Sequence, residues 1–179
     1  SIAGDLSSGK TTVTSLMQET LGYEIYRNGE YFRKLAADMG MSVTEFNVYV
    51  KDHPEIDRQI EQSAKEYAAT RENLIIDARL GWYAVPDSFK IYLRVDIDEA
   101  AKRAYDDPNR KKTENLSSVE AQKADMIKRF NLENERYFNL YGVHKEDMSN
   151  YDLVVDTTNI TPQQVAKIIK REYLKWLEA

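Results

Sequence analysis

The stretch Gly4-Asp5-Leu6-Ser7-Ser8-Gly9-Lys10-Thr11 decides the fold of this chain. It fills every fixed position of the pattern G-x-x-x-x-G-K-[ST], a P-loop whose backbone N–H groups surround phosphate oxygens. Ile2-Ala3 before it is expected to end a buried strand, and Thr12-Val13-Thr14-Ser15-Leu16-Met17 after it begins an apolar-periodic helix. Strand, loop and helix in this order favour a phosphate-binding loop over a chance match in a Ser/Gly turn.

The residues of this loop suit a phosphate ligand. Gly4 and Gly9 let the backbone approach the anion closely or adopt positive φ. Lys10 is expected to reach the β and γ phosphates, and the Thr11 hydroxyl is expected to hold Mg²⁺ at the start of the helix. The residues predicted to bind the phosphates of ATP are Gly4, Asp5, Leu6, Ser7, Ser8, Gly9, Lys10, Thr11 and Thr12.

Composition indicates a single globular domain. The 179 residues suffice for one full core, so residues 1–179 are predicted to form one domain. The chain has no cysteine, which removes disulfides and thiolate metal sites, and a reducing cytoplasm is the expected location. The net charge of −5, with both signs interspersed, argues against a nucleic-acid surface, and no apolar run is long enough to span a bilayer.

Short apolar runs alternate with helical segments along the chain. The predicted strands are Ile2-Ala3 and residues 23–26, 74–77, 89–96 and 151–156. This alternation predicts an α/β fold, the three-layer fold of P-loop NTPases, with a five-stranded parallel sheet and helices on both faces. Ligands of such sheets bind outside the carboxyl ends of the strands. The segments expected at those ends are the P-loop, Asn28-Gly29, Asp77-Ala78-Arg79 and Asp156-Thr157.

Helix start signals mark the remaining segments. Between the second and third strands, one helix is expected after Asn28-Gly29, one at a capping box over residues 42–45, and one at Pro54. A second capping box, from Ser117 to Glu120, is expected to open a long helix to about residue 141. Thr161 is predicted to cap the last helix.

Charged residues near the strand ends could bind phosphate or metal. Arg33 and Arg79 could each clamp a phosphate, although a lone arginine is often a solvated surface residue. Asp77 ends the third strand and could hold Mg²⁺ through water, or simply form the turn. His53 and His144 stand far apart, so protein side chains alone are not expected to form a metal site.

One face of the long helix carries charge. Arg129, Glu133 and Arg136 stand at i, i+4 and i+7, so two guanidinium groups flank a carboxylate. Upstream, Arg110-Lys111-Lys112 lie in a polar loop. A basic loop joined to an arginine-bearing helix is suited to closing over a transferring phosphoryl group, and a helix face of salt bridges is the alternative. We therefore expect a lid region over residues 106–136.

Several motifs together resemble those of the nucleoside monophosphate kinases, most closely the archaeal-type cytidylate kinases and their bacterial relatives. The likeness covers nearly the whole chain. Besides the P-loop, it rests on Arg27-Asn28-Gly29-Glu30-Tyr31-Phe32-Arg33, Asp77-Ala78-Arg79-Leu80-Gly81-Trp82, Arg110-Lys111-Lys112, the R-x-x-x-E-x-x-R-Y segment from Arg129 to Tyr137, and Tyr151-Asp152-Leu153-Val154. The G-E-x-F-R segment and the R-x-x-x-E-x-x-R-Y helix are its more specific parts.

The resemblance implies a role for each segment. The residues that would bind the acceptor monophosphate, within a helical insertion over residues 28–71, are Gly29, Arg33 and Arg79. Those that would act on the transferring phosphoryl group are Lys10, Arg110, Arg129 and Arg136. Asn159 would lie near the donor adenine, and Thr11 and Asp77 would hold the Mg²⁺ that accompanies ATP.

The chain departs from the family pattern at four places that concern the site. Arg27 stands where the family has serine, Ala78 replaces a glycine, the loop before Trp82 is one residue shorter, and Asp5 puts an acid in the P-loop. These departures leave the identity of the acceptor more open than phosphoryl transfer itself.

The expected function is transfer of the γ-phosphoryl group of ATP to a nucleoside monophosphate, with CMP or dCMP as the favoured acceptor. A phosphate acceptor is largely ionised at neutral pH, so we assign no general base. Two alternatives remain: a kinase for another small metabolite, and an ATP-binding module with little turnover. The expected partners are ATP and a nucleoside monophosphate, without nucleic acid or membrane, and a monomer is favoured.

Overall fold

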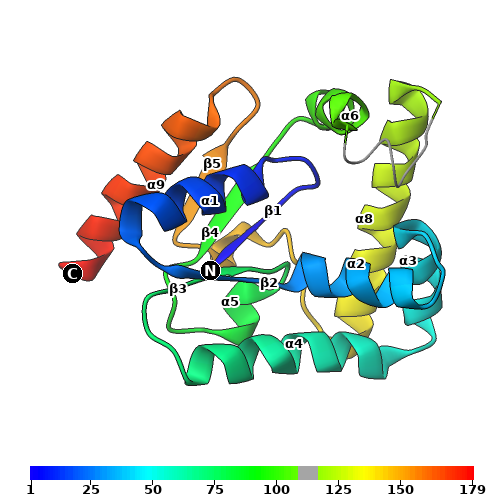
Figure 1. The fold of residues 1–179 in the computed structure, drawn as a ribbon, viewed down its shortest axis with the longest axis horizontal. Helices are drawn as coiled ribbons and strands as arrows, with labels where there is room; N and C mark the ends of the chain where they lie inside the picture. Colours follow the sequence, from blue (N-terminus) through cyan, green and yellow to red (C-terminus); the bar gives the residue numbers. More distant parts are fainter. Residues whose placement is uncertain (109–116) are drawn as a thin grey trace.

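A five-stranded parallel sheet forms the centre of the computed structural model, which describes residues 1–108 and 117–179 (Figure 1). The strands are β1 (Ile2–Gly4), β2 (Glu24–Arg27), β3 (Leu74–Asp77), β4 (Ile91–Arg94) and β5 (Leu153–Asp156). Their order is β2-β3-β1-β4-β5, and each neighbouring pair is parallel. The α/β class and the five strands predicted from the sequence are confirmed.

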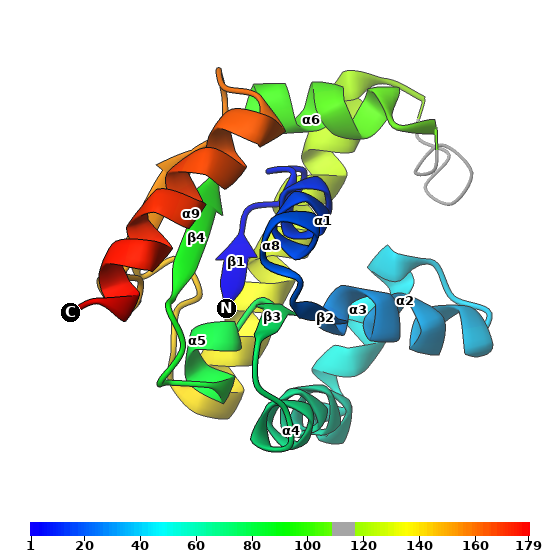
Figure 2. The ribbon, with the colours of Figure 1, turned by 60° about the vertical axis from the view of Figure 1, so that its left-hand side comes forward.

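Helices cover both faces of the sheet, as predicted (Figure 2). On one face lie α1 (Lys10–Leu21) and α9 (Pro162–Leu177), and on the other lie α5 (Gly81–Ala84) and α8 (Val119–Tyr141). The core between the sheet and the first pair is mainly aliphatic, with Val13, Leu93 and Ile169 almost fully buried. This packing fixes α1, and with it the loop that leads into α1.

Three helices connect β2 to β3, as the sequence predicts: α2 (Asn28–Asp38), α3 (Val43–Lys51) and α4 (Pro54–Ala69). The predicted capping box starts α3, because the Ser42 hydroxyl accepts from the Glu45 N–H at 3.2 Å and Glu45 Oε2 accepts from the Ser42 N–H at 2.8 Å. Ala36, Phe46 and Val50 are buried together and give these helices a hydrophobic cluster of their own.

The other helical segments follow the fourth strand. The helix α6 (Ile97–Asp106) packs on α8 through a small cluster that includes Ala100, Ala104 and Met126. A short 3₁₀ helix, η1 (Met148–Asn150), precedes β5. In the part of the chain that the structure describes, no helix is both long and apolar enough to cross a membrane.

The helix ends show where sequence patterns were sufficient. Thr161 caps α9 as predicted, with its hydroxyl accepting from the Gln164 N–H at 3.2 Å. The capping box predicted at Ser117 and Glu120 is wrong. The cap is Ser118, whose hydroxyl accepts from the Ala121 N–H at 3.1 Å. The helix therefore begins one residue later, and Glu120 falls one position short of the place from which it could close the box.

Candidate functional site

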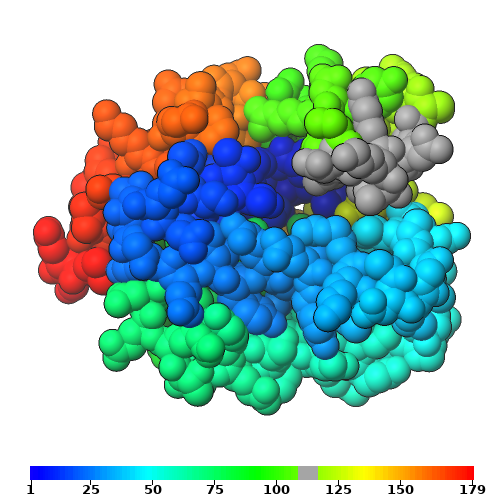
Figure 3. Space-filling model, in the orientation of Figure 1, coloured from blue at the N-terminus to red at the C-terminus, as the bar shows by residue number. Residues whose placement is uncertain are grey.

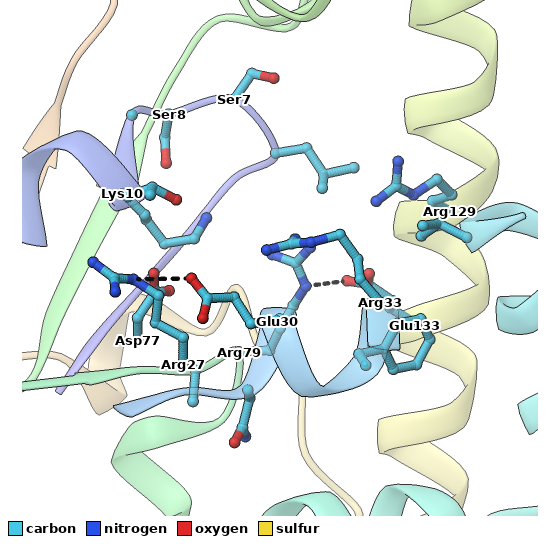
Figure 4. Close-up of a pocket in the computed structure, with 18 of the residues that line it drawn as sticks. Ser7, Ser8, Lys10, Arg27, Glu30, Arg33, Asp77, Arg79, Arg129 and Glu133 are labelled. Carbon is cyan, nitrogen blue, oxygen red and sulfur yellow. Dashed lines mark ion pairs between the residues drawn. The ribbon is translucent and has the colours of Figure 1, made fainter. Parts of the chain in front are cut away.

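The carboxyl ends of the strands face a cavity of ≈ 510 Å³ (Figure 3). Figure 3 shows the surface hollowed beside the dark blue loop between β1 and α1. The four segments that the sequence places at strand ends all contribute to the lining, through residues such as Ser8, Gly29, Arg79 and Thr157. Arginines from α2, from the turn after β3 and from α8 face the loop from the other side (Figure 4).

The phosphate loop depends on its glycines at both ends. Gly4 has φ 150°, and a Cβ there would lie 2.3 Å from the carbonyl oxygen of Leu93, so no larger residue fits against β4. Gly9 has φ 86° and immediately precedes α1. The hydroxyls of Ser7 and Ser8 are buried and find no hydrogen-bond partner among the described residues. Buried hydroxyls of this kind are available to donate to a phosphate oxygen.

Asp5, the acid in the phosphate loop, accepts two hydrogen bonds from the neighbouring strand region. The Asp5 carboxylate accepts from the Tyr92 hydroxyl at 2.6 Å and from the Val95 N–H at 3.0 Å. Burial, followed by the charge of Asp5, raises the pKa of Tyr92, so this phenol stays protonated as a donor. The carboxylate thus ties the loop to β4, and Asp5 can face a phosphate only through its backbone.

Lys10 folds back over the loop that precedes it. Its Nζ donates to the carbonyl oxygens of Gly4 at 2.7 Å and Asp5 at 2.8 Å. Burial, followed by the nearby charge of Arg79, lowers the pKa of Lys10 to about 7, and Asp77 opposes this effect. A phosphate beside the ammonium would favour its charged form.

Asp77 and Thr11 bring two oxygen donors to the same cavity. Burial raises the pKa of Asp77, while the charges of Lys10 and Arg79 lower it. Carboxylate and hydroxyl oxygens are ligands that Mg²⁺ prefers, and this ion takes most of its remaining ligands from phosphates and water. The donor set therefore fits a magnesium ion carried by a nucleotide. Within residues 1–108 and 117–179, no group of three or more His, Cys, Asp or Glu side chains could hold a metal by itself.

Arg27 lines the cavity beside Asp77 (Figure 4). It stands at the position where the kinase family described above has serine. Its Nη2 donates to the Ser15 hydroxyl at 3.2 Å, and its Nε lies 3.7 Å from Glu30 Oε1. Its charge also lowers the pKa of Asp77. The substitution thus links β2 to α1 and adds a positive charge to this wall.

Arg79 is held by a buried carboxylate from α8. Its Nε forms an ion pair with Glu133 Oε2 at 2.8 Å (Figure 4). Lys145 Nζ donates to the same oxygen at 2.6 Å. Burial acts to raise the pKa of Glu133, but Arg79 and Lys145 together hold it far below its ordinary value. The ionised Glu133 fixes the orientation of Arg79, and Arg129, buried one turn away on α8, adds to the positive charge.

Arg33 and Gly29 form the outer edge of the cavity. A Cβ on Gly29 would lie 3.4 Å from Arg33 Nη1, so the guanidinium folds back over the first turn of α2. Thr12 and Leu6 line the same space.

Arg136 lines the cavity but is engaged in a buried ion pair. Its Nε donates to Asp57 Oδ2 at 2.9 Å, and its Nη1 donates to Asn47 Oδ1 at 2.8 Å. These contacts join α8 to α3 and α4. Asp57 and Asn47 are site neighbours that the sequence did not reveal, because their partner lies 79 or more residues away.

The far end of the cavity lies at the loop after β5. Thr157 and Ile160 line it, whereas Asn159, predicted near an adenine, is exposed and is not among the described lining residues. Arg103 of α6, which the sequence did not single out, also lines it and donates from Nη2 to Thr157 O at 2.8 Å. Arg110, predicted to act on the phosphoryl group, lies outside the described residues.

A parallel sheet with a phosphate loop after β1, and facing arginines after β3 and on α8, defines the P-loop class of phosphate-transferring α/β proteins. The sequence comparisons specify the family. The model of the Cytidylate kinase-like family matches residues 1–159, and the chain belongs to this family. The family resemblance inferred from the motifs is thereby confirmed.

Two relatives illustrate the similarity. A protein named cytidylate kinase in Thermoplasma acidophilum is 35% identical over 172 residues, which cover 94% of this chain and 88% of the relative. A cytidylate kinase of Thermococcus kodakarensis is 38% identical over 170 residues, with 94% and 84% covered. Both likenesses span nearly the whole length of each protein.

Solved structures show the same architecture at low sequence identity. A shikimate kinase from Bacteroides thetaiotaomicron superposes with a TM-score of 0.63 at 14% identity, covering 99% of this chain and 97% of the other. This likeness supports the fold alone, and it agrees with the P-loop kinase arrangement predicted from the sequence.

Proposed function

We propose that this protein transfers the γ-phosphoryl group of ATP to a nucleoside monophosphate, with CMP and dCMP as the preferred acceptors. The observation that carries the proposal is one cavity in which the phosphate loop, with Lys10, faces Arg33 and Arg79. Membership of the cytidylate kinase-like family, and relatives named as cytidylate kinases, favour a pyrimidine acceptor.

The reaction needs alignment and charge neutralisation more than proton transfer. An oxygen of the acceptor phosphate forms a bond to the γ-phosphorus while the bond from that phosphorus to the β,γ-bridging oxygen breaks, which gives ADP and a nucleoside diphosphate. The acceptor phosphate is largely ionised near neutral pH, so no side chain has to remove a proton. Lys10 and the loop N–H groups would neutralise charge on the donor, Arg79 would do so on the acceptor, and Arg129 would do so on the transferring phosphoryl group.

Magnesium belongs to this proposal as a companion of ATP. Thr11 and Asp77 would hold the ion, directly or through water. When bound, Mg²⁺ neutralises and aligns the phosphate oxygens.

Binding of ATP would also change the contacts of Lys10. Its Nζ would give up its hydrogen bonds to the carbonyl oxygens of Gly4 and Asp5 and donate to the phosphates instead.

The remaining predicted assignments are proposed on the same basis. Gly29, Arg33 and Arg79 would bind the acceptor phosphate within the helical insertion over residues 28–71. Arg136 would act on the transferring phosphoryl group, and its ion pair with Asp57 joins α8 to α4. Residues 106–136, including Arg110, would form a lid, and Asn159 would lie near the donor adenine. A cytoplasmic location and a monomeric state remain predictions.

The direct test is acceptor-dependent ADP release from ATP-Mg²⁺ with CMP, dCMP, UMP, dTMP, AMP and GMP. We expect strong stimulation by CMP or dCMP. Stimulation by none of the six, with ATP binding intact, would refute the proposal. It would favour the alternatives of another small-metabolite acceptor or an ATP-binding module with little turnover.

A further inference from the structure

Two buried polar side chains that line the cavity carry atoms without a hydrogen-bond partner among the described residues. Asn28 and Glu61 are each 5% exposed. Neither Nδ2 nor Oδ1 of Asn28 meets a partner among the described residues, and the same is true of Glu61 Oε2. A buried polar group without a partner costs stability, so its presence calls for an explanation.

These side chains lie on elements that are tied to each other. Asn28 begins α2 and Glu61 lies in the middle of α4. Gln59 Nε2 on α4 donates to the Tyr31 hydroxyl on α2 at 2.8 Å, and the hydroxyls of Tyr26 and Ser63 are hydrogen-bonded. The backbone that carries Asn28 and Glu61 is therefore braced. Both residues line the cavity, so a ligand there lies beside side chains whose polar atoms have no partner among the described residues.

The cavity around this pair has the character of a base-binding pocket. Phe32, Ile60 and Tyr137 contribute apolar and aromatic surface to its lining. The phosphate-binding arginines Arg33 and Arg79 line the same cavity. A nucleotide presents these two kinds of surface at once: an anionic phosphate at one end, and a flat base with a polar edge at the other.

We propose that Asn28 and Glu61 recognise the base of the acceptor, and that cytosine is the base they fit. This inference rests on the proposed function and adds its specificity-determining residues. The Glu61 carboxyl accepts from the exocyclic amine of cytosine, and the Asn28 amide donates to the ring nitrogen or carbonyl oxygen beside it. Uracil carries a carbonyl oxygen in place of the amine, which an ionised carboxylate repels.

The electrostatics of Glu61 agree with this assignment. Burial, followed by the charge of Asp57, raises the pKa of Glu61 to about 8, and Lys65 opposes the shift. An amine that donates to the carboxyl would offset part of the cost of its ionisation. A cytosine amine is such a donor, so acceptor binding and ionisation of Glu61 would favour each other.

The test compares the affinities of CMP, UMP and ribose 5-phosphate by NMR titration of the folded protein at a pH above 8, where Glu61 is ionised. Asn28→Ala should weaken CMP binding about tenfold and leave ribose 5-phosphate unchanged, because the latter has no base. Glu61→Gln should lower the ratio of CMP to UMP affinity about tenfold, because the amide can donate to the uracil oxygen. Glu66→Gln, an exposed position on the same helix, is the matched control and should change neither ratio nor affinity.

Unchanged CMP affinity in Asn28→Ala together with an unchanged CMP-to-UMP ratio in Glu61→Gln would overturn the inference. An equal loss of ribose 5-phosphate binding would also overturn it, because it would indicate a general distortion. The expected affinities without ADP formation from ATP and CMP would support the base-reading pair and refute only the proposed kinase activity. Thermal melting of each variant checks that it folds.

Discussion

At the scale of single residues, Lys10 is a buried ammonium group whose pKa is lowered by its surroundings in the cavity. It is bound to two carbonyl oxygens of its own loop, and burial lowers its pKa to about 7. An ammonium under these conditions is poorly compensated by the protein alone. A nucleotide phosphate supplies the compensation, so the site favours an anionic ligand at this point.

Replacing Lys10 should separate catalysis from folding. We expect Lys10→Ala to lower kcat about 100-fold or more, because it removes a charge that neutralises the transferring phosphoryl group. Without nucleotide, the melting temperature should stay near that of the wild type, since a poorly compensated buried charge is lost. Steady-state kinetics and thermal melting measure the two effects, with the exposed Lys167→Ala on α9 as control. Turnover near the wild-type value would remove Lys10 from the mechanism.

At the scale of elements, α8 organises the positive side of the cavity. Glu133 forms an ion pair with Arg79, which follows β3, and Arg136 forms an ion pair with Asp57 on α4. Both contacts are made by one helix face, at the i, i+4 and i+7 spacing evident in the sequence. The helix thereby sets the separation between the end of β3 and the helices that follow β2.

The Arg136–Asp57 pair should contribute more to stability than a surface pair on the same helix. Arg136→Met leaves Asp57 buried and unpaired, and we expect it to cost about 3–5 kcal/mol of unfolding free energy in urea denaturation. Adding Asp57→Leu should restore most of the loss. The exposed pair of Lys51 and Glu135, 2.8 Å apart, is the control, and its loss should change the free energy of unfolding far less. A similar small cost for Arg136→Met would contradict the assigned role.

Patterns within short windows predicted the elements well. The five strands, the three helices before β3 and the cap at Thr161 follow from local periodicity and capping chemistry. The four-residue helix α5 was not predicted, because so short a segment carries no periodic signal. At 117–118 two adjacent serines offered alternative caps, and sequence alone selected the wrong one.

The sequence predicted which residues line the site better than it predicted which side chains contact one another there. The P-loop motif identified Lys10, the position after the third strand identified Arg79, and helical spacing identified Arg129; all three line the cavity. The partner of Arg136 lies 79 residues away, and Asn28 and Glu61 become conspicuous only once their burial and missing partners are known. Contacts between distant segments depend on how helices pack on the sheet, and single residues carry no signal for that packing.

At the scale of the whole molecule, the cavity lies where three hydrophobic clusters meet. Val13 belongs to the cluster of the sheet, Phe32 packs on that of α2 and α3, and Leu6 packs on that of α6 and α8. All three residues line the cavity. The polar groups between these clusters, Glu61 among them, are buried by the assembly of the whole fold.

Burial of Glu61 should make global stability depend on pH. Its pKa is raised from 4.5 to about 8, so between these values the folded state retains a proton that the unfolded chain has released. Stability should therefore fall as pH rises through this range, by up to about 1.4 kcal/mol per pH unit, and level off above pH 8. Urea denaturation of the wild type and Glu61→Gln measures this slope. Equal slopes for both proteins would contradict the burial of an acid at this position.

The central claim is that a phosphoryl group moves from ATP to a nucleoside monophosphate within this cavity. Phosphorus-31 NMR of the protein with ATP, Mg²⁺ and CMP tests it directly, because both products are seen at once. The expected result is the appearance of CDP and ADP in equal amounts, absent from Lys10→Ala over the same period. ADP accompanied only by inorganic phosphate, or no change in ATP, would contradict it.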